Sequence, residues 1–244
     1  LGELEPEDIE SITLTNTDGT TATYTVAEVL AGIEVKIPAG TAAADMPKVT
    51  VVPVDDDIYE VSEAFTGEIS APVNATLGTP TADGSFVDED DNNPDTPDDP
   101  KDGDKPVVAI SADPAVAVEG EPTGVVFHIT QTGESELDTT VTFKLDLGEL
   151  EPEDIESITL TNTDGSTVTY TVDQILAGIE ITIPANSTQA PAVTVVPKQD
   201  DIYEIIENFK GVISDPTEGT IVVDTAQASF VDEADNNPDT PDAR

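Results

Sequence analysis

Two short stretches of the sequence concentrate carboxylates in a pattern that predicts metal binding. The first is VDDDIYEVSEAF, residues 54–65, and the second is KQDDIYEIIENF, residues 198–209. At an effective dielectric constant near 20, two carboxylates about 4 Å apart repel by about 4 kcal/mol, which is comparable to much of a domain's net stability. Such clusters need either exposure to water or a bound cation. Ca²⁺, which takes about six to eight oxygen ligands, suits them best.

The acidic character extends to the whole chain and excludes several classes of partner. Of its 244 residues, 52 are Asp or Glu and 8 are Lys or Arg, so the formal net charge is −44. Phosphate groups need Lys and Arg, so we expect neither nucleic acid nor an anionic membrane surface as a partner. No run of about 20 apolar residues is present, and we expect no insertion into a membrane. The absence of cysteine excludes disulfides and zinc-thiolate sites.

Catalytic signatures are scarce, and we predict that the chain is not an enzyme. His128 is the only histidine and falls in an alternating, strand-like segment, where a structural side chain is the simpler interpretation. Paired carboxylates can hydrolyse glycosides, but the same cluster repeated in tandem fits a structural role better than a single active site.

The clusters recur because the chain is a tandem repeat. LGELEPEDIESITLTNTDG stands at residues 1–19 and again, unchanged, at residues 147–165, an offset of 146. The DIYE motif recurs with an offset of 144, so a loop between the two landmarks differs in length. Residues 106–146 precede the second copy and have no counterpart before the first. We therefore predict a partial repeat at 1–91 that lacks its leading strands, a linker at 92–105, a complete repeat at 106–235 and the start of a further linker at 236–244.

The segments that must position the clusters have the features of β-strands. GVVFHITQ, TTVTFKLDL, GIEITIPA and AVTVVP are short, alternating and rich in β-branched residues. Such spacing predicts an all-β fold of tandem antiparallel, immunoglobulin-like β-sandwiches. TNTDGS, residues 161–166, is typical of a hairpin turn, and VDQILAG predicts one helical turn that ends at Gly178.

The two repeats are joined by a short acidic, proline-rich linker. DEDDNNPDTPDDPKDGDKP covers residues 88–106, and DEADNNPDTPD repeats part of it at residues 232–242. Proline stiffens such a segment, while its carboxylates either extend it by repulsion or bind a cation. The candidate calcium ligands of this junction are Asp90, Asp91, Asp95, Asp102 and Asp104.

Three motifs, taken in order, resemble a known family. They are VAVEGE at residues 116–121, QDDIYEIIENF at residues 199–209 and SFVDEAD at residues 229–235. Together they are similar to the Calx-β domain of sodium/calcium exchangers and to the sandwich repeats of giant RTX-type adhesins of Gram-negative bacteria. The resemblance implies a Calx-β-like sandwich that binds Ca²⁺ through the middle aspartates, the carbonyl before the aromatic residue, the following glutamates, the early glutamate and the terminal acidic run.

The resemblance also nominates individual ligands. In the first copy they are Asp55, Asp56, Ile58 through its carbonyl, Glu60, Glu63, Asp88 and Asp90. In the second copy they are Glu119, Glu121, Asp200, Asp201, Ile202 through its carbonyl, Glu204, Glu207, Asp232 and Asp235. Gln199 replaces the first aspartate of the motif and Ala234 stands opposite Asp90, so we expect the second copy to hold fewer ions.

These observations predict a structural function. We expect a calcium-stabilised extender segment of a secreted bacterial surface adhesin, which projects a distal adhesive domain for attachment or biofilm formation. We expect its partners to be neighbouring repeats of the same chain and each repeat to be monomeric. We expect the protein to lie at the cell surface after export by type I secretion. Two alternatives are a regulatory calcium-sensing module and an acidic surface adapted to high salt with a ligand-binding role. The unchanged 19-residue stretch favours a duplicated, length-giving module.

Overall fold

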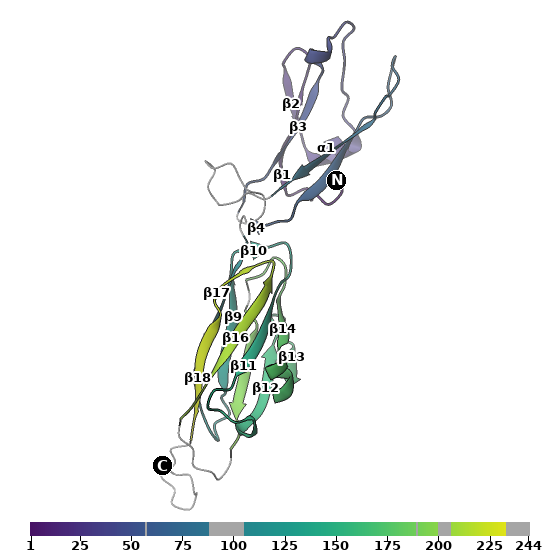
Figure 1. Cartoon of the computed structure of the whole chain (residues 1–244). Helices are drawn as coiled ribbons and strands as arrows, with labels where there is room; N and C mark the ends of the chain where they lie inside the picture. Colours follow the sequence, from purple (N-terminus) through teal and green to yellow (C-terminus); the bar gives the residue numbers. More distant parts are fainter. Residues whose placement is uncertain (57, 88–104, 189, 200–205, 233–244) are drawn as a thin grey trace, which may run out of the picture. The chain divides into compact units, whose positions relative to one another are not determined.

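The computed structural model describes residues 1–56, 58–87, 105–188, 190–199 and 206–232 and divides into two compact units (Figure 1). The first unit contains the described residues 1–56 and 61–87. The second contains residues 58–60 together with the described residues from 105 onward. Almost all regular structure in both units is β, so the predicted all-β class is confirmed. None of the described helices is long and apolar enough to cross a membrane.

The second unit is a sandwich of two sheets. One sheet has the strand order β13-β12-β15-β9-β7-β17 and the other has the order β14-β11-β16-β18-β8. The strands of the first sheet are β7 (Val107–Ala112), β9 (Val125–Thr132), β12 (Ile155–Thr161), β13 (Thr167–Tyr170), β15 (Ala192–Pro197) and β17 (Thr220–Val223). Those of the second are β8 (Val116–Val118), β11 (Thr139–Asp146), β14 (Ile179–Ile183), β16 (Glu207–Thr217) and β18 (Thr225–Val231).

Two edge pairings depart from the antiparallel arrangement that the sequence predicts. β17 pairs with β7, and β8 with β18, in parallel. Each of these pairs joins strands that are far apart in the chain, so no short hairpin dictates their direction. The remaining pairs within the two sheets are antiparallel.

The core of this sandwich contains four fully buried phenylalanines. Phe127 of β9 faces Phe143 of β11 and Phe209 of β16, with ring centroids 5.7 and 6.1 Å apart, respectively. Phe209 in turn meets Phe230 of β18 edge to face at 4.8 Å. Contacts of this kind between two sheets bury apolar area and add specific ring geometry. The alternating burial along β9 and β11 follows from the two-residue period of a strand.

Local sequence signals determine the turns. The predicted hairpin joins β12 to β13, where the amide of Gly165 donates to the carbonyl of Asn162 at 2.9 Å. Asp164 accepts hydrogen bonds from Ser166, which lower the pKa of its exposed carboxyl. Helix α2 (Val172–Ala177) begins at a capping box of Thr171 and Gln174 and ends at Gly178, whose φ of 104° favours glycine. Both predictions are confirmed.

The first unit repeats part of this architecture. It contains a sheet of order β2-β1-β3 and a hairpin of β5 with β6. Their bounds are β1 (Ile9–Thr15), β2 (Thr21–Tyr24), β3 (Lys48–Pro53), β5 (Glu63–Glu68) and β6 (Thr81–Phe86), with helix α1 (Val26–Ala31) and the 3₁₀ helix η1 (Ala43–Asp45) between β2 and β3. The register of β1 with β3 reproduces that of β12 with β15, including the same irregularity near the start. The five strands therefore correspond to β12, β13, β15, β16 and β18.

A short segment after β3 groups with the second unit. β4 (Ile58–Tyr59) pairs in parallel with β10 (Glu134–Ser135). Tyr59 is buried there, and its hydroxyl lies 3.3 Å from a carboxylate oxygen of Glu218. The ammonium of Lys105 lies 5.7 Å from the centre of the tyrosine ring. Tyr59 thus packs against protein, as expected for an amphipathic aromatic side chain. The second unit also contains the 3₁₀ helix η2 (Pro152–Asp154).

Candidate metal centre

Three acidic residues of the second unit, Glu119, Glu207 and Asp232, lie at the same end of the β16-β18-β8 part of its sheet. Phe230 of β18 faces the core and is paired with Ala117 of β8 on one side and with Glu207 of β16 on the other. Side chains two residues apart on a strand share a face. Asp232 and Glu119, two residues beyond Phe230 and Ala117, therefore take the inner face beside Glu207. The amide of Glu119 donates to the carbonyl of Val231 at 3.0 Å, which holds the two chain segments together there.

These three carboxyl groups are largely withdrawn from water. Glu119 is only 3% exposed, and one carboxylate oxygen each of Glu119 and Glu207, and both of Asp232, are shielded from solvent. Neither oxygen of Asp232 accepts a hydrogen bond from any residue that the structure describes. Burying carboxylates in this way is costly unless a proton or a cation compensates them. Hard oxygen donors gathered from three strands fit a Ca²⁺ ion.

A fourth oxygen donor reaches the same end from the other sheet. Gln199 follows β15, and its side-chain oxygen lies where a β-carbon would stand on Gly120, the residue after Glu119. Gly120 has a φ of 74°, a conformation that favours glycine. The sequence indicates only that Gln199 replaces a carboxylate. The structure adds that its carboxamide oxygen, a neutral ligand of the kind that Ca²⁺ accepts, lies against Gly120, the residue that follows Glu119.

The other predicted ligands of the second copy are placed differently. Glu121 is exposed on the turn after β8. The remaining ones lie outside the described residues, and their role stays a prediction: Asp200, Asp201, Ile202, Glu204 and Asp235.

In the first copy, the boundary between the two units runs through the acidic motif. Glu63 is buried and pairs with Phe86, as Glu207 pairs with Phe230, whereas Asp55 and Asp56 are exposed after β3. Ile58 and Glu60 group with the second unit. The terminal and junction ligands Asp88, Asp90, Asp91, Asp95, Asp102 and Asp104 lie outside the described residues. The convergence of the first-copy ligands stays a prediction.

Sequence reasoning missed a buried aspartate that positions the acidic motif. Asp154 is 8% exposed, and its carboxylate accepts a hydrogen bond from the amide of Glu151 at 3.1 Å. Its backbone carbonyl accepts from the amide of Lys198 at 2.8 Å, directly before Gln199. Asp8 has the same contact with Val54 in the first unit. The signal was present in the unchanged PEDIE stretch, where an aspartate precedes an apolar strand and so is placed at a turn.

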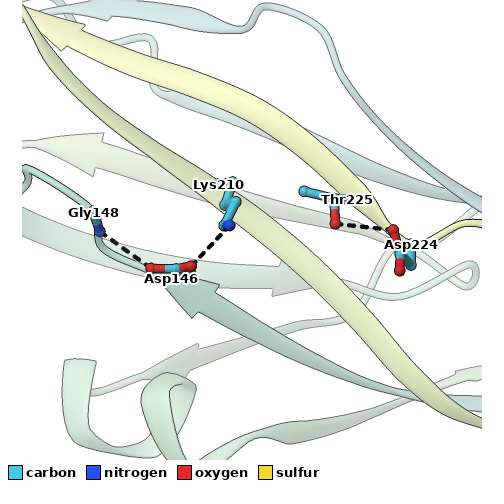
Figure 2. A network of polar contacts seen from close by, with 5 residues as sticks. All are labelled: Asp146, Gly148, Lys210, Asp224 and Thr225. Carbon is cyan, nitrogen blue, oxygen red and sulfur yellow. Dashed lines mark hydrogen bonds and ion pairs between the residues drawn. The ribbon is translucent and has the colours of Figure 1, made fainter.

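Several other carboxylates have ordinary protein partners. Asp146 at the end of β11 contacts the ammonium of Lys210 at 3.0 Å and accepts a hydrogen bond from the amide of Gly148 at 3.3 Å (Figure 2). The hydrogen bond from Lys210, followed by its charge, lowers the pKa of Asp146. In the same figure Asp224 accepts from the hydroxyl of Thr225 at 3.0 Å. Exposed pairs of this kind contribute little to stability, unlike a buried cluster.

The single histidine has a structural contact. His128 of β9 places Nε2 3.1 Å from the backbone carbonyl of Asp113, in the turn that follows β7. This contact ties β9 to the neighbouring turn.

No family model and no curated protein matches this chain. Among solved structures, it is similar to the apo form of the Calx CBD1 domain, with a TM-score of 0.35 and 15% identity over 52% of this chain and 97% of that one. It is also similar to CBD12 from CALX1.2, with a TM-score of 0.37 and 14% identity over 52% of this chain and 46% of that one. It is similar as well to the calcium binding domain CBD12 of CALX1.1, with a TM-score of 0.36 and 14% identity over 52% of this chain and 47% of that one. At this level of likeness nothing about function follows from the match.

Proposed function

We propose that this chain is a calcium-stabilised structural segment, and more specifically an extender of a secreted bacterial surface adhesin. The observation that carries the calcium part is the set of Glu119, Glu207 and Asp232 at the same end of three neighbouring strands. Glu119 is buried, and both Asp232 oxygens are shielded from water. An ion bound there would cancel the repulsion among the carboxylates. It would also tie β8, β16 and β18 to one another.

Binding at such a site is coupled to folding. The three side chains come from residues 119, 207 and 232, so an unfolded chain does not hold them together. An ion that binds the folded state more tightly than the unfolded state adds its binding free energy to stability. In low calcium, repulsion within a chain of net charge −44 favours a loose, secretion-competent state, whereas millimolar calcium outside the cell favours the folded one.

The extender role rests on the tandem architecture. The two copies share an unchanged 19-residue stretch and the same strand register, as expected for modules whose number sets the reach of the chain. In this proposal the partners are neighbouring repeats, and the task of the segment is to hold a distal adhesive domain away from the cell. No catalytic step is involved.

Substitution of Asp232 tests the calcium site directly. Asp232→Asn removes the charge of the buried carboxylate, and we expect about a tenfold or larger loss of affinity at one site, because a coordinating carboxylate is replaced by a weaker neutral ligand. Isothermal titration with CaCl₂ measures the loss. Asp224→Asn is the matched control, since Asp224 lies in the same unit and its carboxylate accepts a hydrogen bond from the hydroxyl of Thr225. Isotherms that are identical for the two variants and the unmodified chain would contradict the assignment.

The extender role has its own test. Small-angle X-ray scattering of the 244-residue chain is expected to show a larger maximum dimension and a narrower range of conformations in calcium than in EDTA, because ions bound at the acidic junction would stiffen it. Magnesium at equal ionic strength is the control. Scattering profiles that are indistinguishable with and without calcium would leave the site as a stabiliser of single repeats and would remove the support for an extender.

A further inference from the structure

The loop at residues 147–154 lies next to both ends of the acidic segment, residues 199–207, in the second unit. This loop connects β11 of one sheet to β12 of the other, and the acidic segment leads back from β15 to β16. The last residue of β11 is in register with Lys210 of β16, and the first residue of β12 with Pro197 of β15. The two connections therefore leave and enter the sheets at neighbouring positions.

The loop holds the start of β16, which carries the candidate ligand Glu207. Beyond the last pair of β11 with β16, the amide of Glu149 donates to the carbonyl of Asn208 at 3.0 Å. The carboxylate of Glu149 accepts from Nδ2 of Asn208 at 2.8 Å and from its amide at 3.3 Å. These bonds, the side-chain one first, lower the pKa of Glu149. The residue directly after Glu207 is thus fixed on the edge that faces away from β18.

A glycine allows this close approach of the loop to the strand. Gly148 has a φ of 57°, and a β-carbon on it would stand 2.6 Å from the carbonyl oxygen of Asn208. Both the backbone conformation and the available space therefore favour glycine at this position. In the first unit the equivalent Gly2 has a φ of 78°, and a β-carbon on it would collide with the carbonyl oxygen of Ala64.

The first unit repeats the same contacts. The amide of Glu3 donates to the carbonyl of Ala64 at 3.1 Å, and the carboxylate of Glu3 accepts from the amide of Ala64 at 3.3 Å. Ala64 precedes β5 residue Phe65 as Asn208 precedes Phe209 in β16, and Asn208 adds a side-chain donor that alanine lacks. The arrangement is therefore a property of the repeat, and it accounts for the glycine and the glutamate of the unchanged LGELEPED stretch.

The other end of the same loop holds the residue before the acidic segment. The carbonyl of Asp154 accepts from the amide of Lys198 at 2.8 Å, and the ammonium of Lys198 lies 3.3 Å from the carbonyl of Glu153. The buried carboxylate of Asp154 accepts from the amide of Glu151, which fixes the turn of the loop itself. One short loop is thus bonded to the residue before the acidic segment and to the residue after it.

We infer that the 147–154 loop fixes both ends of the acidic segment and thereby raises its affinity for calcium, with Glu149 as a positioning residue and not a ligand. A ligand whose backbone is already held loses less conformational freedom when the ion binds, and groups behind the ligands of a metal site orient them in this way. The inference rests on the proposed function, which assigns calcium to the site of Glu119, Glu207 and Asp232.

Substitution of Glu149 in the 244-residue chain tests this role. Glu149→Ala is expected to weaken calcium binding about tenfold at the site that Asp232→Asn affects, as measured by titration with CaCl₂. Glu149→Gln keeps an acceptor oxygen opposite Asn208 and should recover most of the affinity. Glu153→Ala is the matched control, because it removes one charge from the same loop and keeps the backbone carbonyl that contacts Lys198. It should bind calcium nearly as well as the unmodified chain.

Two further measurements distinguish positioning from a general effect on stability. In EDTA, Glu149→Ala should lower the protection of the Asn208 amide against hydrogen exchange, because that amide loses its acceptor, while the amides of β15 and β18 keep theirs. The melting temperature in EDTA should stay the same, and the rise that calcium produces should become smaller. Retained protection in β15 and β18 also verifies that the variant is folded.

The possible failures can be told apart. If the unmodified chain binds calcium through Asp232 and Glu149→Ala binds it equally well, the role of the loop is overturned and the calcium site stands. A loss in Glu149→Gln as large as that in Glu149→Ala would mean that the charge of Glu149 acts on the ion directly. Equal falls of the melting temperature in EDTA and in calcium would make the loop a structural element alone. If the unmodified chain binds no calcium, the proposed function fails and this inference fails with it.

Discussion

In excess EDTA, the chain is expected to melt about 10 °C below its melting temperature in a few millimolar Ca²⁺. A ligand at about 100 times its dissociation constant stabilises the folded state by about 2.7 kcal/mol, and each kcal/mol shifts the melting temperature of a domain of this size by about 4 °C. The buried carboxylates of Glu119, Glu207 and Asp232 are the groups whose repulsion the ion would relieve. Circular dichroism during a thermal scan measures the shift.

Magnesium and sodium chloride at equal ionic strength are the controls for this experiment. Mg²⁺ demands a smaller, near-octahedral site and gives up its water reluctantly, so a calcium site made of protein oxygens should respond to it weakly. If either control raises the melting temperature as much as calcium does, screening of the −44 charge explains the stabilisation. An acidic surface adapted to high salt would then be the better description of this chain.

Features encoded in short stretches of sequence could be predicted with little ambiguity. The Asp164–Gly165 turn and the helix that ends at Gly178 depend on residues next to one another, and both occur where they were expected. The all-β class follows from the alternation of β-branched residues, which is also local. The position of Glu207 at the inner edge of its sheet follows from that alternation once the strand is recognised.

Features that depend on distant partners could not be read in the same way. Residues 33–37 and 179–183 have nearly the same sequence, yet only the second segment is a strand, because β11 lies beside it. The parallel pairing of β8 with β18, which brings Glu119 beside Val231, joins residues more than a hundred positions apart. The contact between Gln199 and Gly120 likewise joins residues that are far apart in the sequence. A ligand list drawn from motifs therefore names candidate residues, whereas the placement of these residues relative to one another depends on the tertiary fold.

Truncation of an equivalent phenylalanine in each unit would measure how far the two cores differ. Phe209→Ala should lower the free energy of unfolding of the second unit by about 3–5 kcal/mol, because it leaves a cavity in a fully packed core. Phe209 is 2% exposed and contacts the rings of Phe127 and Phe230. Hydrogen exchange of the amides in β15 under native conditions reports this loss for the second unit alone.

Phe65→Ala is the matched variant in the first unit, and we expect it to cost less than half as much, about 1–2 kcal/mol. Phe65 is only half-buried, and among the described residues its one aromatic neighbour is Phe86, with ring centroids 5.1 Å apart. Exchange of the amides in β3 is the readout. Equal losses in the two units would contradict this expectation, because they would mean that the ring of Phe65 is packed as completely as that of Phe209.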